Sequence, residues 1–194
     1  MDGFGASDTK YIMKANHNTK TWKNWWDEKL GLIESDSSGN IYTRAGNIYE
    51  HPIIEAVDDG IITDGQILIE DLLLRVNFDG WKNGTIYEIK TRNVNTVWKP
   101  YNNFDIPKDY WMQCQVEMYA YQTMYKKWFL PKFKELILIE YPLHDDEYDV
   151  DEPEIDPNRI RQHKIRYNKD WIKGEYLPNL KILSRALKKG KYPG

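Results

Sequence analysis

Two acidic side chains are predicted to face each other across a β-hairpin. The hairpin covers residues 75–92, and Asn83 and Gly84 form its turn, because both tolerate the positive φ angles of a type I′ turn. This turn sets a register in which Asp79 lies opposite Glu88, with their Cβ atoms about 4.5–5.5 Å apart. Two carboxylates at that separation repel each other unless a proton or a cation lies between them. The pattern therefore predicts a metal site.

Lys90 adds a third functional group to this predicted site. It follows Glu88 by two residues, so both lie on the same side of the strand, and the register places it opposite Asn77. Asp79 and Glu88 would offer carboxylate oxygens to a hard divalent cation such as Mg²⁺, with the backbone carbonyl of Ile89 as a third ligand. Lys90 would then orient an attacking water. The alternative interpretation is that these residues form only the solvated face of an antiparallel sheet.

The predicted hairpin needs a core to support it. Asp64 and Gly65 are predicted to form the turn of a further hairpin, between the apolar runs 61–63 and 66–70. In the main hairpin, alternating apolar residues indicate that one face is buried. We expect that face to carry Leu72, Leu74, Val76, Phe78, Tyr87 and Ile89.

Helical periodicity and capping residues predict five helices around these strands. Ser7 would cap the first, three tryptophans would form a core stripe on the second, and Pro52 would bend or restart the third. Segments 35–40 and 93–108 are predicted loops. We expect one α/β (α+β) domain over residues 1–194, with a central mixed sheet flanked by helices. The expected helices are 8–14, 21–30, 41–57, 109–128 and 170–189, and the later strands are 135–141 and 159–167.

Composition narrows the class of protein. Residues 145–156 hold eight acids and no Lys or Arg, so the other 182 residues carry a formal charge of +5 although the whole chain carries −3. A basic DNA-binding face and an ordinary mixed surface are both compatible with that balance. The single cysteine, Cys114, excludes an internal disulfide. Without a signal peptide or a membrane-spanning apolar run, we expect a cytoplasmic protein.

Five segments of the sequence resemble one known family. In order they are GASDTKYIM with TWKNWWDEKLGL, AGNIYEHPII, NFDG, EIK and IPKDYWMQCQVEMY. Together they resemble the PD-(D/E)XK nuclease superfamily, and within it the YqaJ-like viral recombinases related to phage lambda exonuclease. The resemblance covers nearly the whole chain, and it implies a restriction-endonuclease-like core.

The resemblance also implies roles for the residues in the matching motifs. Asp79 and Glu88 match the metal-binding pair, and Lys90 matches the catalytic lysine of the Glu-x-Lys motif. Glu50 maps onto a further acidic residue that helps to hold metal. Without the resemblance, Glu50 would be read, like Glu55, as an ordinary exposed helix carboxylate.

The last segment contributes a glutamine to the expected site. Gln113 and Gln115 point about 200° apart on a helix, so only one of them can face the metal. We expect Gln113, which shares a helix face with Tyr110, and keep Gln115 as the alternative. Tyr110 and Gln115 are also weaker candidates for contacts with DNA.

Recognition of a DNA end is the point at which the sequence departs from the family. Many members carry a basic residue just before the Gly-x-Ser segment, where it engages the 5′-phosphate, and this sequence has none there. Ser7 resembles a phosphate-contacting serine at a helix N-terminus, with a simple helix cap as the alternative. Candidate substitutes for the basic residue are Arg44, Arg92, Lys99 and Lys10.

The resemblance implies that the protein is a Mg²⁺-dependent deoxyribonuclease, with Mn²⁺ able to substitute. It implies a 5′→3′ exonuclease that acts on double-stranded DNA ends in phage-type homologous recombination. Implied partners are a single-strand annealing protein and further copies of the chain in a ring-shaped trimer, in the cytoplasm of a bacterial host that carries the phage or prophage. The alternatives are an endonuclease or flap-type nuclease of the same fold, and a non-catalytic DNA-binding module.

Overall fold

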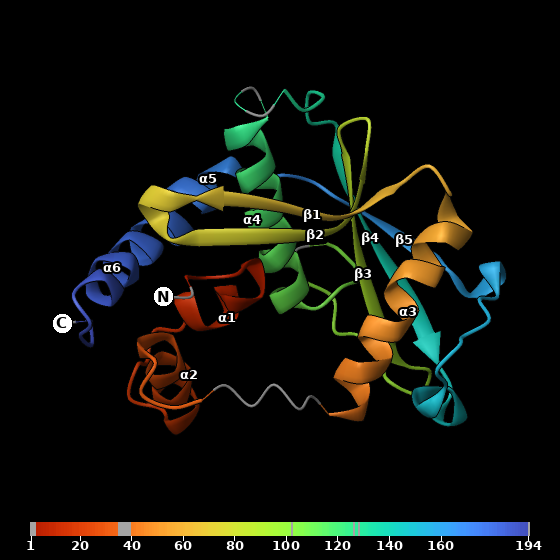
Figure 1. The fold of residues 1–194 in the computed structure, drawn as a ribbon, viewed down its shortest axis with the longest axis horizontal. Helices are drawn as coiled ribbons and strands as arrows, with labels where there is room; N and C mark the ends of the chain where they lie inside the picture. Colours follow the sequence, from red (N-terminus) through yellow and green to blue (C-terminus); the bar gives the residue numbers. More distant parts are fainter. Residues whose placement is uncertain (1–2, 35–39, 102, 126, 128, 194) are drawn as a thin grey trace.

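A five-stranded mixed sheet lies at the centre of the computed structural model, which describes residues 3–34, 40–101, 103–125, 127 and 129–193. The strands lie in the order β1-β2-β3-β4-β5. Strands β3 and β4 are parallel, and the other neighbours are antiparallel. In Figure 1 the hairpin of β1 and β2 runs in a different direction from β3 and β4. The strands are Ile62–Ile69 (β1), Leu74–Lys82 (β2), Thr85–Asn93 (β3), Glu135–Leu143 (β4) and Arg161–Ile165 (β5).

Helices flank this sheet, so the fold class expected from the sequence is confirmed. Helix α3 is continuous through Pro52 and needs no restart there. The predicted closing helix consists of α5, a π-helical segment Ile172–Tyr176, and α6. The predicted loop 35–40 lies almost entirely outside the described residues, as does residue 128, the predicted end of the fourth helix. The helices are Thr9–Ile12 (α1), Lys20–Leu30 (α2), Ile41–Val57 (α3), Lys108–Met124 (α4), Lys169–Trp171 (α5) and Leu177–Lys188 (α6).

The turn between β2 and β3 forms where the sequence predicts it. Asn83 and Gly84 have φ angles of 51° and 89°, the two positive values that a type I′ turn requires. The predicted register holds for the three residue pairs nearest the turn. Beyond these pairs β2 separates from β3, so the predicted pair of Asn77 and Lys90 does not form. Strand β2 pairs with β1 along nearly its whole length, and Asn77 lies opposite Gln66 there.

Replacing Gly84 with alanine is expected to destabilise the protein by more than about 1 kcal/mol. Alanine disfavours the positive φ angle, and its Cβ would lie 2.1 Å from the carbonyl oxygen of Lys132. Gly174→Ala is the matched control, because no atom lies within 4 Å of the added Cβ and the φ angle is not positive. It should be neutral or stabilise by up to about 1 kcal/mol. Urea denaturation of both variants measures the difference, and equal effects would contradict this account.

The hairpin predicted at Asp64 and Gly65 is wrong. Strand β1 continues through both residues in one register against β2, and Asp64 takes a positive φ of 58° inside the strand. The chain reverses instead through a 3₁₀ turn at Glu70–Leu72, followed by Leu73 at φ 51°. Long-range pairing with β2 therefore overrides the local turn preference of the Asp-Gly pair.

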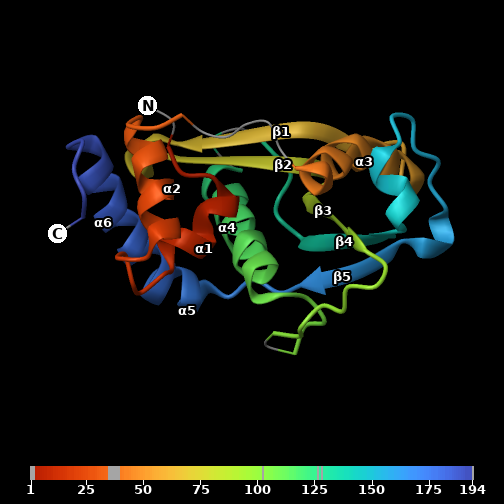
Figure 2. The same cartoon turned by 90° about the horizontal axis from the view of Figure 1, so that it is seen from below.

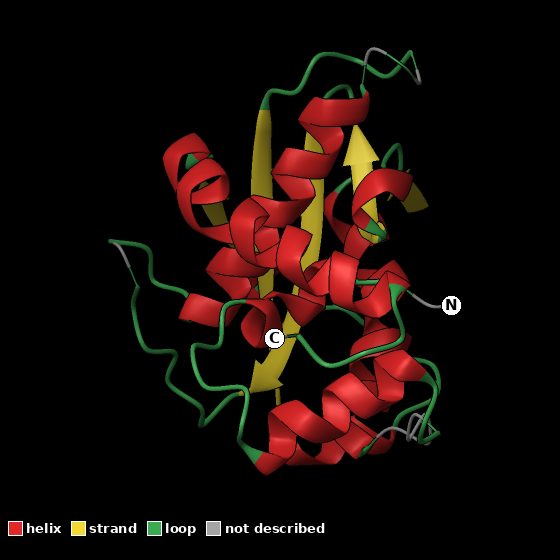
Figure 3. Ribbon diagram, turned by 90° about the vertical axis from the view of Figure 1, so that its left-hand side faces the viewer, coloured by secondary structure: helices red, strands yellow, loops and turns green. Residues whose placement is uncertain are grey.

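Two hydrophobic clusters cover opposite faces of the sheet. The α4 cluster includes Phe78 and Ile86 together with the N-terminal helices, α4 and α6, whereas the α3 cluster includes Ile54 and Ile89, with Tyr87 packed at its edge. Figure 2 shows α4 and α3 on either side of β3, and Figure 3 shows the helices of the α4 side in front of the strands. Tyr87 and Ile89 thus lie on the face opposite to the one predicted. Tyr87 still pairs with Gly80, whose added Cβ would contact Ile54 and Ile61 of the α3 cluster, so the face of β2 changes between Phe78 and Gly80.

The N-terminal segment runs beside β2. The amide of Phe4 donates to the Leu73 carbonyl, and the amide of Arg75 donates to the Phe4 carbonyl. A 3₁₀ turn, Ala6–Asp8, precedes α1, and the side chain of Asp8 accepts a hydrogen bond from the Gly5 amide. Ser7 therefore lies inside the turn and is not the helix cap that the sequence suggests. The predicted tryptophan stripe on α2 does lie in the core.

Candidate active site

Asp79, Glu88 and Lys90 lie together where β2 separates from β3. Glu88 is buried, with 2% of its side chain exposed, and its Oε1 lies 2.5 Å from Lys90 Nζ. The described pairing of β2 with β3 ends one residue pair before Asp79 and Glu88. Asp79 Oδ2 instead accepts a hydrogen bond of 2.7 Å from the amide of Ile89. The divergence of the two strands therefore frees the Asp79 carboxylate while holding it beside Glu88.

Helix α4 supplies an amide and an aromatic ring to the same place. Gln113 Nε2 donates to Glu88 Oε1 at 2.5 Å and to Glu117 Oε1 at 3.0 Å. Glu88 Oε1 therefore contacts both Gln113 and Lys90. The ammonium group of Lys90 lies 5.5 Å from the centre of the Tyr110 ring. Gln113 and Tyr110 thus share the helix face that is turned toward the carboxylates.

Glu50 reaches the site from α3, on the other face of the sheet. It lines an open depression of about 350 Å³ together with Asp79 and residues of β1. Ligand atoms of Glu50, His51 and Asp64 lie within 4.8 Å of one another, and His51 Nε2 lies 3.4 Å from Asp64 Oδ2. Glu50 and Asp79 thus line one depression from two different elements.

Negative charge accumulates among these side chains. Burial and the charge of Glu88 raise the pKa of Asp79 well above its usual value, and the same two causes raise that of Glu50. Burial lowers the pKa of Lys90, but the charges of Glu88 and Asp79 outweigh it, so the net pKa is raised. One lysine thus faces at least three carboxylates. A set of carboxylate oxygens that outnumber the one positive charge fits a hard divalent cation such as Mg²⁺ or Mn²⁺.

Divalent metal is expected to stabilise the protein more at high pH than at low pH. Asp79 and Glu50 have raised pKa values in the folded protein, so they bind protons more tightly there than in the unfolded chain. The stability that this binding contributes is present at low pH and is lost as pH rises through the folded pKa values. A cation would replace those protons, and its stabilising effect should therefore grow as pH rises through the folded pKa values, which an experiment between about pH 5 and about pH 8 would follow.

Thermal unfolding with and without Mn²⁺ across that pH range tests the linkage between metal and protons. The gain in Tm should increase with pH in the wild-type protein. Asp79→Asn, which removes one carboxylate, should reduce the gain at every pH. A gain that does not change with pH would contradict the proposed competition.

Glu117 belongs to the site although sequence analysis did not single it out. It is fully buried, and its Oε2 has no hydrogen-bond partner among the described residues. Burial and the charges of Glu88 and Asp79 raise the pKa of Glu117 well above its usual value, which favours the neutral acid. The one feature of the sequence that could have indicated its place in the site is its position four residues after Gln113, on the same helix face.

The weaker candidates other than Tyr110 have no contact with these carboxylates among the described residues. Gln115 is turned away from them, because its amide group bonds the backbone of residues 166 and 168. Arg92 Nε pairs with Glu140 at 2.5 Å. Arg44 pairs with Asp151 at 2.6 Å, in the acidic segment 145–156. Ser7, Lys10 and Lys99 are exposed, and Lys10 lies over the ring of Tyr11.

No protein-family model and no curated protein sequence matches the chain. Similar solved structures exist, however. The crystal structure of an alkaline exonuclease (LHK-Exo) from Laribacter hongkongensis has a TM-score of 0.64 at 16% identity, covering 97% of this chain and 89% of that chain. The structure of LHK-Exo in complex with dAMP has a TM-score of 0.65 at 17% identity, with the same coverage. The chain has the fold of this alkaline exonuclease.

The alkaline exonuclease fold agrees with the restriction-endonuclease-like core expected from the sequence motifs. The similarity extends over nearly the whole chain. At this level of identity the comparison concerns the fold, so the roles of individual side chains rest on the geometry described above. No helix among the described residues is long and apolar enough to cross a membrane.

Proposed function

We propose that the chain is a metal-dependent deoxyribonuclease that hydrolyses phosphodiester bonds in DNA. One observation carries the proposal: Glu88 Oε1 contacts both Lys90 Nζ and Gln113 Nε2 while the Asp79 carboxylate lies beside it. Carboxylates that can hold a cation, next to a lysine that can approach a reacting phosphate, suit phosphoryl chemistry. The alkaline exonuclease fold supports the same reaction class.

Mg²⁺ is the proposed cofactor, with Mn²⁺ as a substitute. Asp79, Glu88 and Glu50 would hold it, together with the backbone carbonyl of Ile89. The amide of the same residue already fixes Asp79 Oδ2. When bound, the metal would lower the pKa of a coordinated water and offset negative charge on the phosphate.

Lys90 has two tasks in this proposal. Its raised pKa keeps the ammonium group protonated, so it acts as a hydrogen-bond donor and a positive charge and does not serve as a general base. Nζ would orient the attacking water through the water's lone pair, and it would stabilise the charge that develops on the phosphate oxygens. Gln113 holds the Glu88 carboxylate, and the Tyr110 ring borders the ammonium group.

The specific activity we propose is a 5′→3′ exonuclease acting on double-stranded DNA ends. Its product strand would pass to a single-strand annealing protein during phage-type recombination in the cytoplasm of a bacterial host. We further propose that copies of the chain assemble as a ring-shaped trimer around DNA. The similar structure is named an exonuclease, and one of its crystal structures is a complex with dAMP, which supports end-directed cleavage.

A cleavage time course on defined DNA tests this proposal. Linear duplexes labelled at the 5′ or the 3′ end, with and without a 5′-phosphate, are incubated with Mg²⁺ alongside covalently closed circular DNA. A 5′→3′ exonuclease should release the 5′ label first as mononucleotides and should leave the circle intact. Cleavage of the circle would identify an endonuclease, and DNA binding without turnover in Mg²⁺ or Mn²⁺ would overturn the enzymatic assignment.

A further inference from the structure

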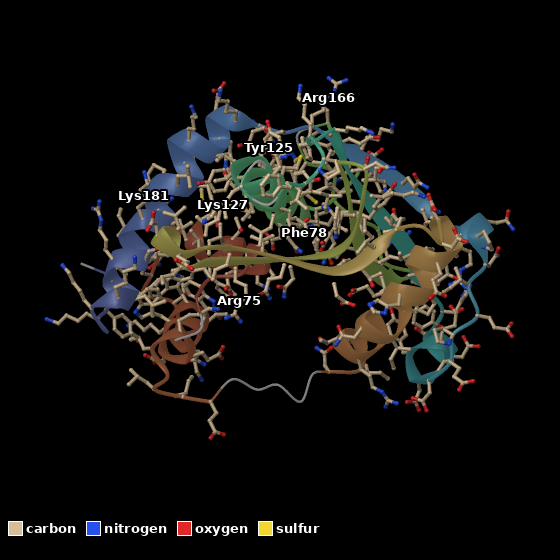
Figure 4. All side chains as sticks on the ribbon, turned by 45° about the horizontal axis from the view of Figure 1, so that its top comes forward. Arg75, Phe78, Tyr125, Lys127, Arg166 and Lys181 are labelled. Carbon is tan, nitrogen blue, oxygen red and sulfur yellow. The ribbon has the colours of Figure 1, made fainter. Side chains whose placement is uncertain are left out.

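The face of the β1 and β2 hairpin that carries Asp79 is polar beyond the metal site. Phe78 and Val76 are buried against the α4 cluster, so the alternate residues Asp79, Asn77 and Arg75 point away from that cluster. In Figure 4, Phe78 lies on the α4 side of the hairpin and Arg75 on the opposite side. The same strand face therefore carries a carboxylate, an amide and a guanidinium group in succession.

The middle of this face is built from two amides. Gln66 of β1 lies directly opposite Asn77, and Gln66 Nε2 donates a hydrogen bond of 2.8 Å to Asn77 Oδ1. Both side chains line the depression that also contains Glu50 and Asp79. Neither amide adds negative charge, so a phosphate chain leaving Asp79 along β2 would meet hydrogen-bonding groups. Asp64 also lines the depression, where it lies 3.4 Å from His51 Nε2.

Arg75 lies at the far end of the face and has no carboxylate partner among the described residues. It is exposed, whereas Lys29 pairs with Asp8 at 2.7 Å and Lys82, at the other end of β2, pairs with Asp58 at 2.6 Å. Its backbone is fixed on both sides, by pairing with Leu68 of β1 and by the bond from its amide to Phe4. A rigid strand thus presents an uncompensated guanidinium group about 13 Å along β2 from Asp79, at about 3.3 Å per residue.

We propose that Arg75 binds a backbone phosphate of the DNA strand whose reacting phosphate lies at Asp79. This inference rests on the proposed nuclease function. A guanidinium group suits the task because it stays charged and can donate two parallel hydrogen bonds to phosphate oxygens. Arg75 contacts substrate away from the reacting atoms, so it is a binding residue and affects KM more than kcat.

DNA binding by variants at this position tests the proposal. Fluorescence anisotropy is measured in Ca²⁺ with labelled duplexes that end in a 5′-phosphate or a 5′-hydroxyl. Arg75→Ala should weaken binding about tenfold and reduce the slope of log K against log salt by about 0.9, the value for one lost phosphate contact. Arg75→Lys should keep the salt slope while losing part of the affinity. Lys181→Ala, at an exposed position on α6, is the control for charge removal and should match the wild-type protein.

The two duplex ends identify the source of the phosphate. A loss confined to the 5′-phosphorylated duplex assigns Arg75 to a terminal phosphate, and a loss on both duplexes assigns it to an internal phosphodiester. Affinity and salt slope equal to wild type in folded Arg75→Ala would overturn the proposal. If Arg75→Ala unfolds, Arg75→Lys decides, and an unchanged affinity there overturns it.

Cleavage assays on the same variants separate this inference from the proposed function. If the wild-type protein binds DNA but does not cut it in Mg²⁺ or Mn²⁺, the proposed function fails, while a weaker Arg75→Ala still supports the phosphate contact. If the wild-type protein cuts DNA and Arg75→Ala cuts and binds equally well, the function stands and the contact fails.

Discussion

Lys90→Ala is expected to lower kcat for DNA hydrolysis by about 10²–10⁴-fold, because it removes the group that orients the water and offsets charge on the phosphate. The variant loses the ion pair with Glu88 and the contact with the Tyr110 ring, so some stability is lost. The fold should survive, because Gln113 still donates to Glu88 Oε1 and the carboxylate can take up a proton. Single-turnover cleavage of a linear duplex in Mg²⁺ measures the effect, and unfolding midpoints confirm that the variant is folded.

A second variant separates catalysis from metal binding. Asp79→Asn should also lose activity, but by weakening metal affinity, whereas Lys90→Ala should bind Mn²⁺ at least as tightly as the wild-type protein because a competing positive charge is gone. Lys164→Ala, an exposed change on β5, should leave both quantities unaltered. Full activity in Lys90→Ala would refute the role given to this lysine.

Glu140→Ala is expected to destabilise the protein by about 3–5 kcal/mol. Glu140 is 4% exposed, and its carboxylate contacts Arg92 Nε at 2.5 Å, His163 Nε2 at 2.8 Å and Arg161 at 3.4 Å. The side chain of Arg92 is only 10% exposed, so removing its partner would leave a buried positive charge. Guanidinium chloride denaturation gives the change in the free energy of unfolding.

A more exposed ion pair between β4 and β5 provides the comparison. Glu135 lies 3.0 Å from Lys164, and their side chains are 38% and 73% exposed. Glu135→Ala should therefore change the free energy of unfolding by no more than about 0.5 kcal/mol. Similar losses for the two glutamates would show that burial of the Arg92 pair has no special energetic weight.

Local backbone chemistry made part of this structure predictable. The turn at Asn83 and Gly84 follows from two adjacent residues that tolerate positive φ, and it places Asp79 near Glu88. The same reasoning failed at Asp64, where a long β1 and β2 ladder offered more hydrogen bonds than a local hairpin could. Sequence signals of this kind hold when tertiary pairing agrees with them.

The site was harder to predict where it depends on the rotation and register of distant elements. Spacing alone left Gln113 and Gln115 as alternatives, and only the packing of α4 against the sheet turns Gln113 toward Glu88. The pairing of Arg92 with Glu140 needs the parallel register of β3 and β4, which are separated by all of α4. No periodicity in the sequence carries that information.

The placement of the site between two separate hydrophobic clusters affects how the fold opens. Glu50 belongs to a helix packed in the α3 cluster, whereas Gln113 belongs to the helix at the centre of the α4 cluster. A cation shared by Glu50 of α3 and Asp79 of β2 would join the α3 layer to the sheet. Without that cation, α3 and the sheet could fluctuate independently. Metal binding would then act as a cross-link that merges two cooperative units, and it would slow amide hydrogen exchange in α3 as strongly as in the sheet.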